Sequence, residues 1–273
     1  MSSSDLYNEI LEETRDLVQR LAHPRRKTLA LSPEVADLYQ TIATEAPGAE
    51  SVFPASAPSA PPVPPAPPTG PAPEALISLE QEVSACTKCE LCTTRTQTVF
   101  ADGNPNADLV FVGEAPGADE DRIGKPFVGK AGQLLTDIIV KGMKLRREDV
   151  YICNVLKCRP PNNRDPLPTE KELCEPYLIR QLELVKPKVI CALGAHAAKT
   201  LLRTEESTGR LRGRWHFYHG IPLRVTYHPA YLLRSPDEKK KTWDDIQHVM
   251  RLLAGAEKAE PGPGSLGDPP PSN

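Results

Sequence analysis

The stretch spanning residues 107–135 most restricts what this chain can fold into. It opens with a short apolar run at residues 109–112, rich in β-branched and aromatic side chains, which is typical of a buried strand. A loop containing glycine and proline follows, and after Gly129 the apolar residues recur at helical spacing. In α/β proteins, ligands bind where a strand ends in such a loop before a helix.

The same alternation continues along the chain. Further apolar, strand-like runs lie at residues 150–156, 189–193 and 222–227, and helical patterns lie at residues 75–83, 168–185, 195–202 and 239–253. Strands that alternate with helices form parallel sheets with helices on both faces. We predict an α/β fold with three layers, α/β/α, around a central, mainly parallel four-stranded sheet.

Proline divides the chain into parts. Ten of its 30 prolines lie between Ser51 and Pro73, where no residue is charged, which predicts an extended linker. We predict a helical, partly disordered arm at residues 1–50, a Pro/Ala-rich linker at 51–74, one domain at 75–257 and a disordered tail at 258–273. The arm is interpreted either as a peripheral segment or as a docking helix for a protein partner.

Charge and hydropathy narrow the class of partner. The net charge of −3 does not indicate a nucleic-acid binder, but basic side chains gather in four clusters, at residues 141–147, 157–164, 203–214 and 234–241. Such clusters around an apolar scaffold favour a polyanion partner. The sequence has no apolar run of membrane-spanning length and no secretory signal, so we expect a cytoplasmic protein in which disulfides are rare.

The seven cysteines therefore need another explanation. Four are spaced as metal ligands: Cys86, Cys89, Cys158 and Cys174. Four thiolates fit either zinc or a [4Fe-4S] cluster, and spacing alone does not separate the two. Cys153 and Cys191 lie in apolar strands and are interpreted as buried core residues. Cys92 would over-fill the site, so we leave it out.

Several polar and aromatic residues lie at or after the carboxyl ends of predicted strands. They are Gly113, Glu114, Ala115, Phe127, Asn154 and His228. Each has an ordinary structural explanation when taken alone. Together, an aromatic face, a carboxamide and a histidine fit the recognition of a planar heterocycle with mixed hydrogen-bonding edges.

Six motifs in a fixed order carry a family resemblance. They are Cys86-x2-Cys89, G-E-A-P-G at 113–117, G-K-P-F-V-G-K-A-G at 124–132, N-V-L-K-C-R-P-P-N-N-R at 154–164, Cys174, and H-P-A-Y-L-L-R at 228–234. Over about residues 75–253 the chain resembles the iron–sulfur (family 4) uracil-DNA glycosylases of bacteria and archaea. The resemblance implies a base excision repair enzyme that flips uracil out of DNA and hydrolyses its N-glycosidic bond.

The resemblance also implies a cofactor and partners. A [4Fe-4S] cluster would be held by the four cysteines named above, which favours iron over zinc. The partner would be uracil-containing DNA, single- or double-stranded. We expect a monomer without membrane association in a bacterial cytoplasm, bound to the nucleoid through DNA.

The resemblance assigns roles to particular residues. Phe127 would stack on uracil, Asn154 would bind its N3–H and O4 edge, and His228 would donate to O2. Ala115 stands where related enzymes have a water-activating Asp, so Glu114, or Glu120 through a water, is expected to position the water. DNA contacts are expected from Arg159, Arg164, Arg212, Leu232 and Arg234, with Leu232 or its neighbour filling the gap left by the flipped nucleotide.

Two alternatives remain at this point. One is an electron carrier built on the same cluster. Such a carrier has no need for Asn154 and His228, which argues against it. The other is a zinc-stapled DNA-binding module without catalysis. A reversible reduction potential in the cellular range would favour the first, and one zinc ion per colourless chain would favour the second.

Overall fold

The computed structural model describes residues 71–267. The predicted arm at residues 1–50, nearly all of the linker, and residues 268–273 lie outside the described residues. Within residues 71–267, no helix combines the length and the apolar character needed to cross a lipid bilayer.

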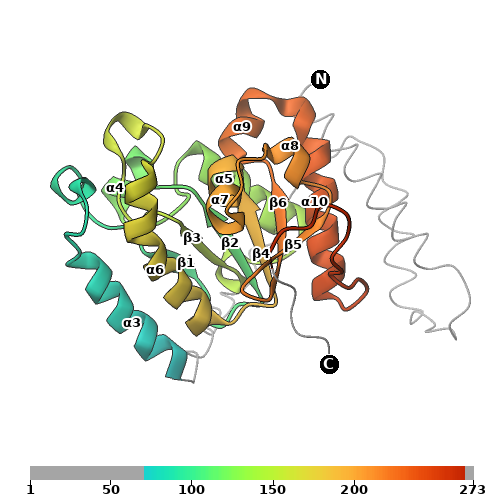
Figure 1. Ribbon diagram of the computed structural model, residues 1–273, viewed down its shortest axis with the longest axis horizontal. Helices are drawn as coiled ribbons and strands as arrows, with labels where there is room; N and C mark the ends of the chain where they lie inside the picture. Colours follow the sequence, from blue (N-terminus) through green and yellow to red (C-terminus); the bar gives the residue numbers. More distant parts are fainter. Residues whose placement is uncertain (1–70, 268–273) are drawn as a thin grey trace, which may run out of the picture. The chain divides into compact units, whose positions relative to one another are not determined.

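One sheet forms the centre of the described domain (Figure 1). Its strands are β1 (Ala101–Gly103), β2 (Leu109–Gly113), β3 (Tyr151–Asn154), β4 (Val189–Leu193), β5 (Trp215–Tyr218) and β6 (Ile221–Thr226). Their spatial order is β1-β3-β2-β4-β6-β5. The four inner strands are parallel, which confirms the predicted sheet. Two short antiparallel edge strands, β1 and β5, extend it beyond the prediction.

The helices connect these strands. They are α3 (Pro71–Ser84), α4 (Ala118–Ile123), α5 (Lys130–Asp137), α6 (Pro168–Val185), α7 (Ala195–Leu202), α8 (Thr208–Leu211), α9 (Pro229–Arg234) and α10 (Lys239–Leu253). Shorter 3₁₀ or π turns are η1 (Glu90–Thr93), η2 (Ile138–Gly142), η3 (Arg147–Asp149), η4 (Pro161–Asn163) and η5 (Pro236–Glu238). Helices α6, α7 and α10 have the bounds that the sequence predicted. Helices α4, α8 and α9 replace predicted loops, because four to six residues are too few for periodicity to reveal a helix.

Two hydrophobic cores cover the two faces of the sheet, since successive strand residues point to opposite sides. On β2, Val110 and Val112 belong to the core shared with α3, α6 and α7. Leu109 and Phe111 belong to the core shared with α5 and α10. The sheet thus lies between two helical layers, as Figure 1 shows, and the three-layer prediction is confirmed.

The register of the parallel strands brings their carboxyl ends to one edge. Gly113 at the end of β2 pairs with Asn154 at the end of β3, and Leu193 pairs with Thr226 on the other side. The chain leaves β2 for β3 on one side of it, and the next connection runs from β3 across β2 to β4 on its other side, so the connections diverge at this edge. A crevice forms where connections diverge in this way.

The segment after α10 differs from the predicted disordered tail. Up to Gly267 it runs along β5, where Phe217 N donates to Leu266 O at 2.8 Å and Ser265 Oγ donates to Trp215 O at 2.6 Å. An edge strand carries backbone groups that no neighbouring strand satisfies, and this segment supplies partners for them.

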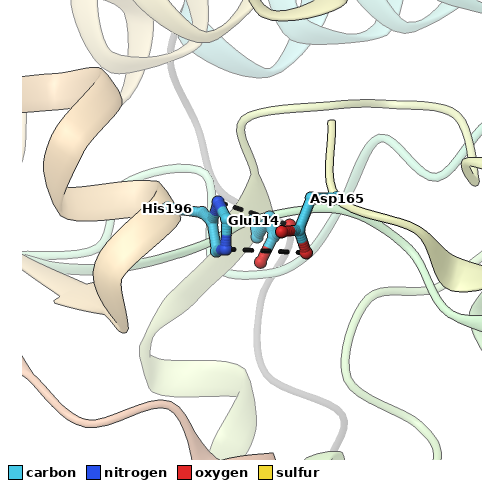
Figure 2. Close-up of side chains that lie close together, drawn as sticks. All are labelled: Glu114, Asp165 and His196. Carbon is cyan, nitrogen blue, oxygen red and sulfur yellow. Dashed lines mark ion pairs between the residues drawn. The ribbon is translucent and has the colours of Figure 1, made fainter. Parts of the chain in front are cut away.

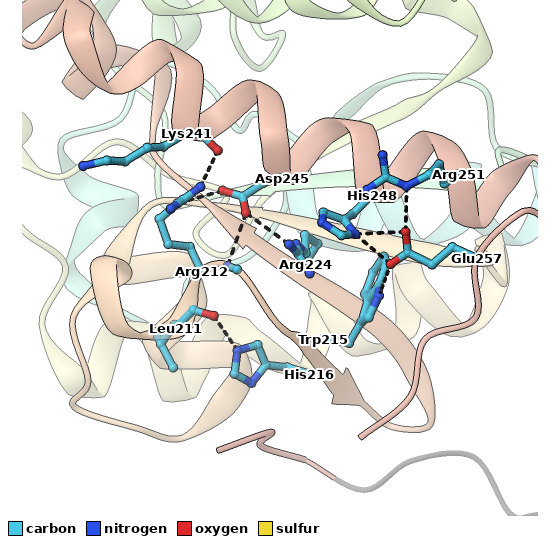
Figure 3. A network of polar contacts seen from close by, with 11 residues as sticks. Leu211, Arg212, Trp215, His216, Arg224, Lys241, Asp245, His248, Arg251 and Glu257 are labelled. Carbon is cyan, nitrogen blue, oxygen red and sulfur yellow. Dashed lines mark hydrogen bonds and ion pairs between the residues drawn. The ribbon is translucent and has the colours of Figure 1, made fainter. Parts of the chain in front are cut away.

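A buried ion-pair network joins α10 to strand β6 (Figure 3). Asp245 on α10 is fully buried, and its carboxylate contacts Arg212 Nε at 2.9 Å and Arg224 Nη2 at 3.4 Å. Arg224 is itself buried, with its guanidinium 5.3 Å from the centre of the Trp215 ring. Because buried charges are costly when unpaired, the three side chains depend on one another.

We expect Asp245→Ala to lower the free energy of unfolding by about 3–5 kcal/mol, since it leaves the buried Arg224 guanidinium unpaired. Urea denaturation measures this change. The matched control is Asp244→Ala, which removes an exposed carboxylate from the same helix and should change stability by less than about 0.5 kcal/mol. Equal effects of the two variants would contradict the expectation.

Candidate active site

A cavity of about 900 Å³ opens at the carboxyl edge of the sheet. The predicted residues that line it are Glu114, Ala115, Phe127, Asn154, Arg164, His228 and Arg234. They come from four separate segments of the chain. The fold therefore brings together most of the residues that the sequence indicated.

Gly113 lies directly behind this cavity. A Cβ atom at this position would lie 2.3 Å from Asn154 Oδ1 and 2.6 Å from Phe127 Cζ. Such separations are far below van der Waals contact, so only glycine lets both side chains approach the end of β2. The glycine shapes the cavity without a side chain of its own.

Asn154 presents an unsatisfied acceptor. Its side chain is only 2 % exposed, and its Oδ1 has no hydrogen-bond partner among the described residues. A buried acceptor without a partner costs about 1–3 kcal/mol, so such an atom in a cavity indicates a ligand that donates to it.

The loop that carries Phe127 is held by Glu120. Glu120 Oε1 accepts from the backbone N–H groups of Val128 and Gly129 at 2.9 and 3.0 Å, and Oε2 accepts from Gly117 N at 3.1 Å. Phe127 has a left-handed φ of 53°, a conformation that costs a bulky residue on the order of 1 kcal/mol and that this loop holds in place. Both carboxylate oxygens are engaged, so the loop clamp differs from the expected role of Glu120 in positioning a water.

His228 is held as a neutral hydrogen-bond donor. Its Nδ1 accepts from Ala230 N at 3.1 Å at the start of α9, which leaves the proton on Nε2. Burial and, to a smaller extent, the positive charge of Arg234 lower the pKa of His228 to about 4. The ring centre lies 5.6 Å from that of Phe127. At neutral pH the imidazole therefore offers Nε2–H beside an aromatic face.

Glu114 lies beside two residues that the sequence analysis missed (Figure 2). His196 Nδ1 is 3.9 Å from Glu114 Oε1, and His196 Nε2 is 3.7 Å from Asp165 Oδ1. Burial raises the pKa of Glu114 to about 7, and the like charge of Asp165 adds to this rise. The sequence signal for His196 was its position two residues after Gly194, just beyond the carboxyl end of β4. The ends of the other three inner strands had each supplied a candidate.

The basic residues expected at DNA have different environments. Arg234 is exposed at the end of α9 and lines the cavity. Arg164 also lines it and forms a two-point ion pair with Glu170, at 2.9 and 2.6 Å. Arg159 does not line the cavity, and its Nε donates to Asn163 Oδ1 at 2.7 Å.

Two residues expected at DNA have side chains that are engaged or buried within the described residues. Arg212 belongs to the buried network, where its guanidinium binds Asp245 and the backbone carbonyl of Lys241. Leu232 is 1 % exposed because α9 turns it into the protein interior, whereas its neighbour Leu233 is 47 % exposed. A segment predicted as a loop gave no basis for deciding which leucine faces outward.

A second, smaller pocket gathers the cysteines. All four predicted ligands line it, together with Cys92: Cys86, Cys89, Cys158 and Cys174. Arg95 Nη1 donates to Cys158 Sγ at 3.2 Å, and Lys157 N donates to Cys174 Sγ at 3.3 Å. Hydrogen bonds to ligand sulfurs are typical of iron–sulfur sites.

The spacing of the sulfurs bears on which metal group fits. In a tetrahedral site with Zn–S bonds of about 2.3 Å, sulfurs lie about 3.8 Å apart. Among residues 71–267, no three cysteine sulfurs lie within 4.8 Å of one another; the one set of ligand-type side chains that does is Glu114, Asp165 and His196. What the structure shows is a pocket in which the four cysteine side chains converge, a donor set that suits a metal group held by thiolates.

Comparison with known proteins agrees with this geometry. The model of the uracil DNA glycosylase superfamily matches residues 100–247. A type-4 uracil-DNA glycosylase from Archaeoglobus fulgidus is 47 % identical over 191 residues, which cover 66 % of this chain and 94 % of that protein. The type-4 uracil-DNA glycosylase from Thermotoga maritima is 45 % identical over 186 residues, 66 % of this chain and 95 % of that protein.

The chain belongs to the type-4 uracil-DNA glycosylase family. A type-5 uracil-DNA glycosylase from Pyrobaculum aerophilum is less similar, at 32 % identity over 197 residues, 66 % of this chain and 85 % of that protein. The family membership accounts for the superfamily fold and for the six ordered motifs.

We expect Gly113→Ala to destabilise this family member by about 1–3 kcal/mol, because the added methyl group overlaps Asn154 and Phe127 in a packed region. Urea denaturation would measure the loss. Gly262→Ala is the control, since its added methyl group meets no atom within 4 Å. A Gly113→Ala variant as stable as Gly262→Ala would contradict the close approach.

Proposed function

We propose that this chain excises uracil from DNA by hydrolysing the N-glycosidic bond, leaving an abasic site for base excision repair. Family membership supports the reaction. The observation that carries its assignment to this cavity is the buried, unpartnered Oδ1 of Asn154, next to an aromatic ring and a neutral imidazole.

Uracil suits the hydrogen-bonding groups of the cavity. Asn154 Oδ1 accepts from uracil N3–H, and the amide NH2 donates to O4. Cytosine exchanges the donor and the acceptor on this edge, so it meets the carboxamide with like groups and is rejected. The base reaches the cavity by leaving the DNA stack and packs against Phe127, which replaces part of the lost stacking.

His228 stabilises the departing base. As the glycosidic bond lengthens, negative charge develops on uracil O2, and Nε2–H of the neutral ring donates to it. The donor is fixed by the Ala230 N–H bond to Nδ1, so little reorganisation is needed when charge appears. One preorganised donor of this kind contributes about 10²–10³-fold to a rate.

Glu114 positions the attacking water. Ala115 has no group that can accept a proton, and the Glu120 carboxylate is engaged with three backbone amides. Glu114 lines the cavity, and its carboxylate accepts none of the backbone hydrogen bonds that engage Glu120, so it can hold a water toward the sugar. Its role needs the deprotonated form.

DNA binds over the mouth of the cavity. Arg234 and Arg164 contact phosphates at the rim, with Arg159 further out, which makes binding dependent on salt. Exposed Leu233, in place of Leu232, fills the gap left by the flipped nucleotide. Both single- and double-stranded DNA are substrates, because flipping supplies the same base in each.

A [4Fe-4S] cluster fits the cysteine pocket, with Cys86, Cys89, Cys158 and Cys174 as ligands. When bound, the cluster supplies a structural cross-link between the segment after α3, the loop after β3 and α6. The donor set and the hydrogen bonds to the sulfurs support this assignment.

The remaining expectations concern the setting of the enzyme. We place it as a monomer in a bacterial cytoplasm, associated with the nucleoid through DNA and without membrane contact. Residues 75–257 act as the catalytic domain, residues 51–74 as a linker, and residues 1–50 either as a peripheral arm or as a docking segment for a protein partner.

The test is release of uracil by iron-replete protein. Single- and double-stranded oligonucleotides with one uracil should yield alkali-sensitive abasic sites, whereas hypoxanthine and thymine mismatches define the base preference. We expect Asn154→Ala to lower kcat/KM by about 10²-fold or more. The control Asn106→Ala removes an exposed carboxamide and should match the wild type. Intact uracil-DNA after treatment with the wild type would refute the function.

The pKa of Glu114 predicts the pH dependence. Since the carboxylate is the active form and its pKa is raised to about 7, kcat/KM should rise with pH and level off above about 7. Asp165→Asn removes a neighbouring like charge, so the midpoint should move to lower pH. Glu114→Gln should lose both this dependence and most of the rate. An unchanged profile in Glu114→Gln would assign the titration to another group.

A further inference from the structure

Lys157 is a charged residue that the proposed reaction does not use. Its side chain is 1 % exposed, although it carries an ammonium group. Removing an ammonium from water costs several kcal/mol unless an anion compensates it. Burial lowers the pKa of Lys157, and the ionisable groups that oppose this shift are cysteines: Cys153, Cys174 and Cys158. The ionisable neighbours of Lys157 are therefore thiols rather than carboxylates.

Lys157 also contacts the base-recognition residue. Its Nζ donates to the backbone carbonyl of Asn154 at 2.6 Å. Its backbone N donates to Cys174 Sγ at 3.3 Å, and Cys158 is the next residue in the chain. One residue thus connects the end of β3, where the Asn154 carboxamide is placed, with two cysteines of the second pocket.

Four thiolates around a [4Fe-4S] core leave a net negative charge, which is the anion that a buried ammonium requires. Arg95 is a second cation at this pocket, through its 3.2 Å contact with Cys158 Sγ. Arg95 reaches the pocket from the segment after η1, and its other bond goes to the carbonyl of Ser84. Lys88 also lines the pocket, and of these three cations Lys157 is the one bonded to Asn154.

We propose that Lys157 is a positioning residue through which the charge of the iron–sulfur cluster holds Asn154 in place for uracil. The cluster keeps the ammonium buried, and the ammonium fixes the carbonyl of Asn154 and with it the carboxamide in the cavity. The inference rests on the proposed function and on the proposed cluster. It gives the cluster a role in base recognition that needs no electron transfer.

The experiment compares Lys157→Met with Lys88→Met in iron-replete protein. Both substitutions remove one ammonium from the cysteine pocket, but Lys88 is exposed and has no bond to Asn154. Three quantities are measured: iron per chain, the reduction potential of the cluster, and binding to DNA that contains a non-cleavable 2′-fluoro-deoxyuridine.

Lys157→Met should shift the potential to more negative values, because a nearby positive charge favours the reduced, more anionic cluster. It should also weaken binding to the fluorinated uracil site by about tenfold or more, as expected when a buried acceptor loses its donor, and leave binding to undamaged DNA unchanged. Lys88→Met should stay within about twofold in binding. Wild-type potential and uracil binding in Lys157→Met would overturn the proposal.

If Lys157→Met does not fold, the variants Lys157→Gln and Lys157→Arg test the same proposal. Gln lacks the charge but can still donate to Asn154, so it should shift the potential while keeping more uracil binding than Met. Iron loss in both neutral variants, with retention in Lys157→Arg, would support the charge role. Equal iron loss in all three would contradict it. A wild type without iron or uracil release would instead refute the proposed function, whatever Lys157 does.

Discussion

The site depends on the register of the parallel sheet. Gly113 and Asn154 are paired residues at the ends of β2 and β3, and this pairing puts a residue without a side chain beside a buried carboxamide. The space is then taken by Asn154 Oδ1 and the ring of Phe127. A shift of one residue would turn Asn154 to the other face of the sheet. The pairing of the strands thus fixes where the Asn154 carboxamide lies at the wall of the cavity.

Near the paired strand ends, hydrogen bonds from backbone amides fix the tautomer of one side chain and the position of another. Ala230 N–H selects the tautomer of His228, and three amides occupy Glu120. Glu114 differs, because burial and Asp165 leave its pKa near 7. The cavity therefore contains one group prepared to donate, one loop clamp and one group whose protonation changes near neutrality. These three roles suit the proposed reaction, in which negative charge develops on the leaving base and a positioned water attacks the sugar.

The cysteine pocket and the base cavity share β3 and the residues after it. Asn154 lines the base cavity and Cys158 lines the cysteine pocket. Lys157 connects the two through its hydrogen bond to the Asn154 carbonyl. Three residues separate Asn154 from Lys157, so a cluster that orders this segment also restrains the end of the strand. The proposed cluster would therefore stabilise the end of β3, which carries Asn154.

The sequence alone determined the inner strands, the bounds of α6, α7 and α10, and the strand-end residues Asn154 and His228, because hydropathy periodicity and strand polarity are local properties. Tertiary structure decided which groups remain available. Leu232 faces inward only because α9 is helical, and Arg212 is engaged because Asp245 lies 33 residues away in sequence but adjacent in space. The meeting of Glu114 with His196 likewise follows from packing between distant segments, which no local pattern encodes.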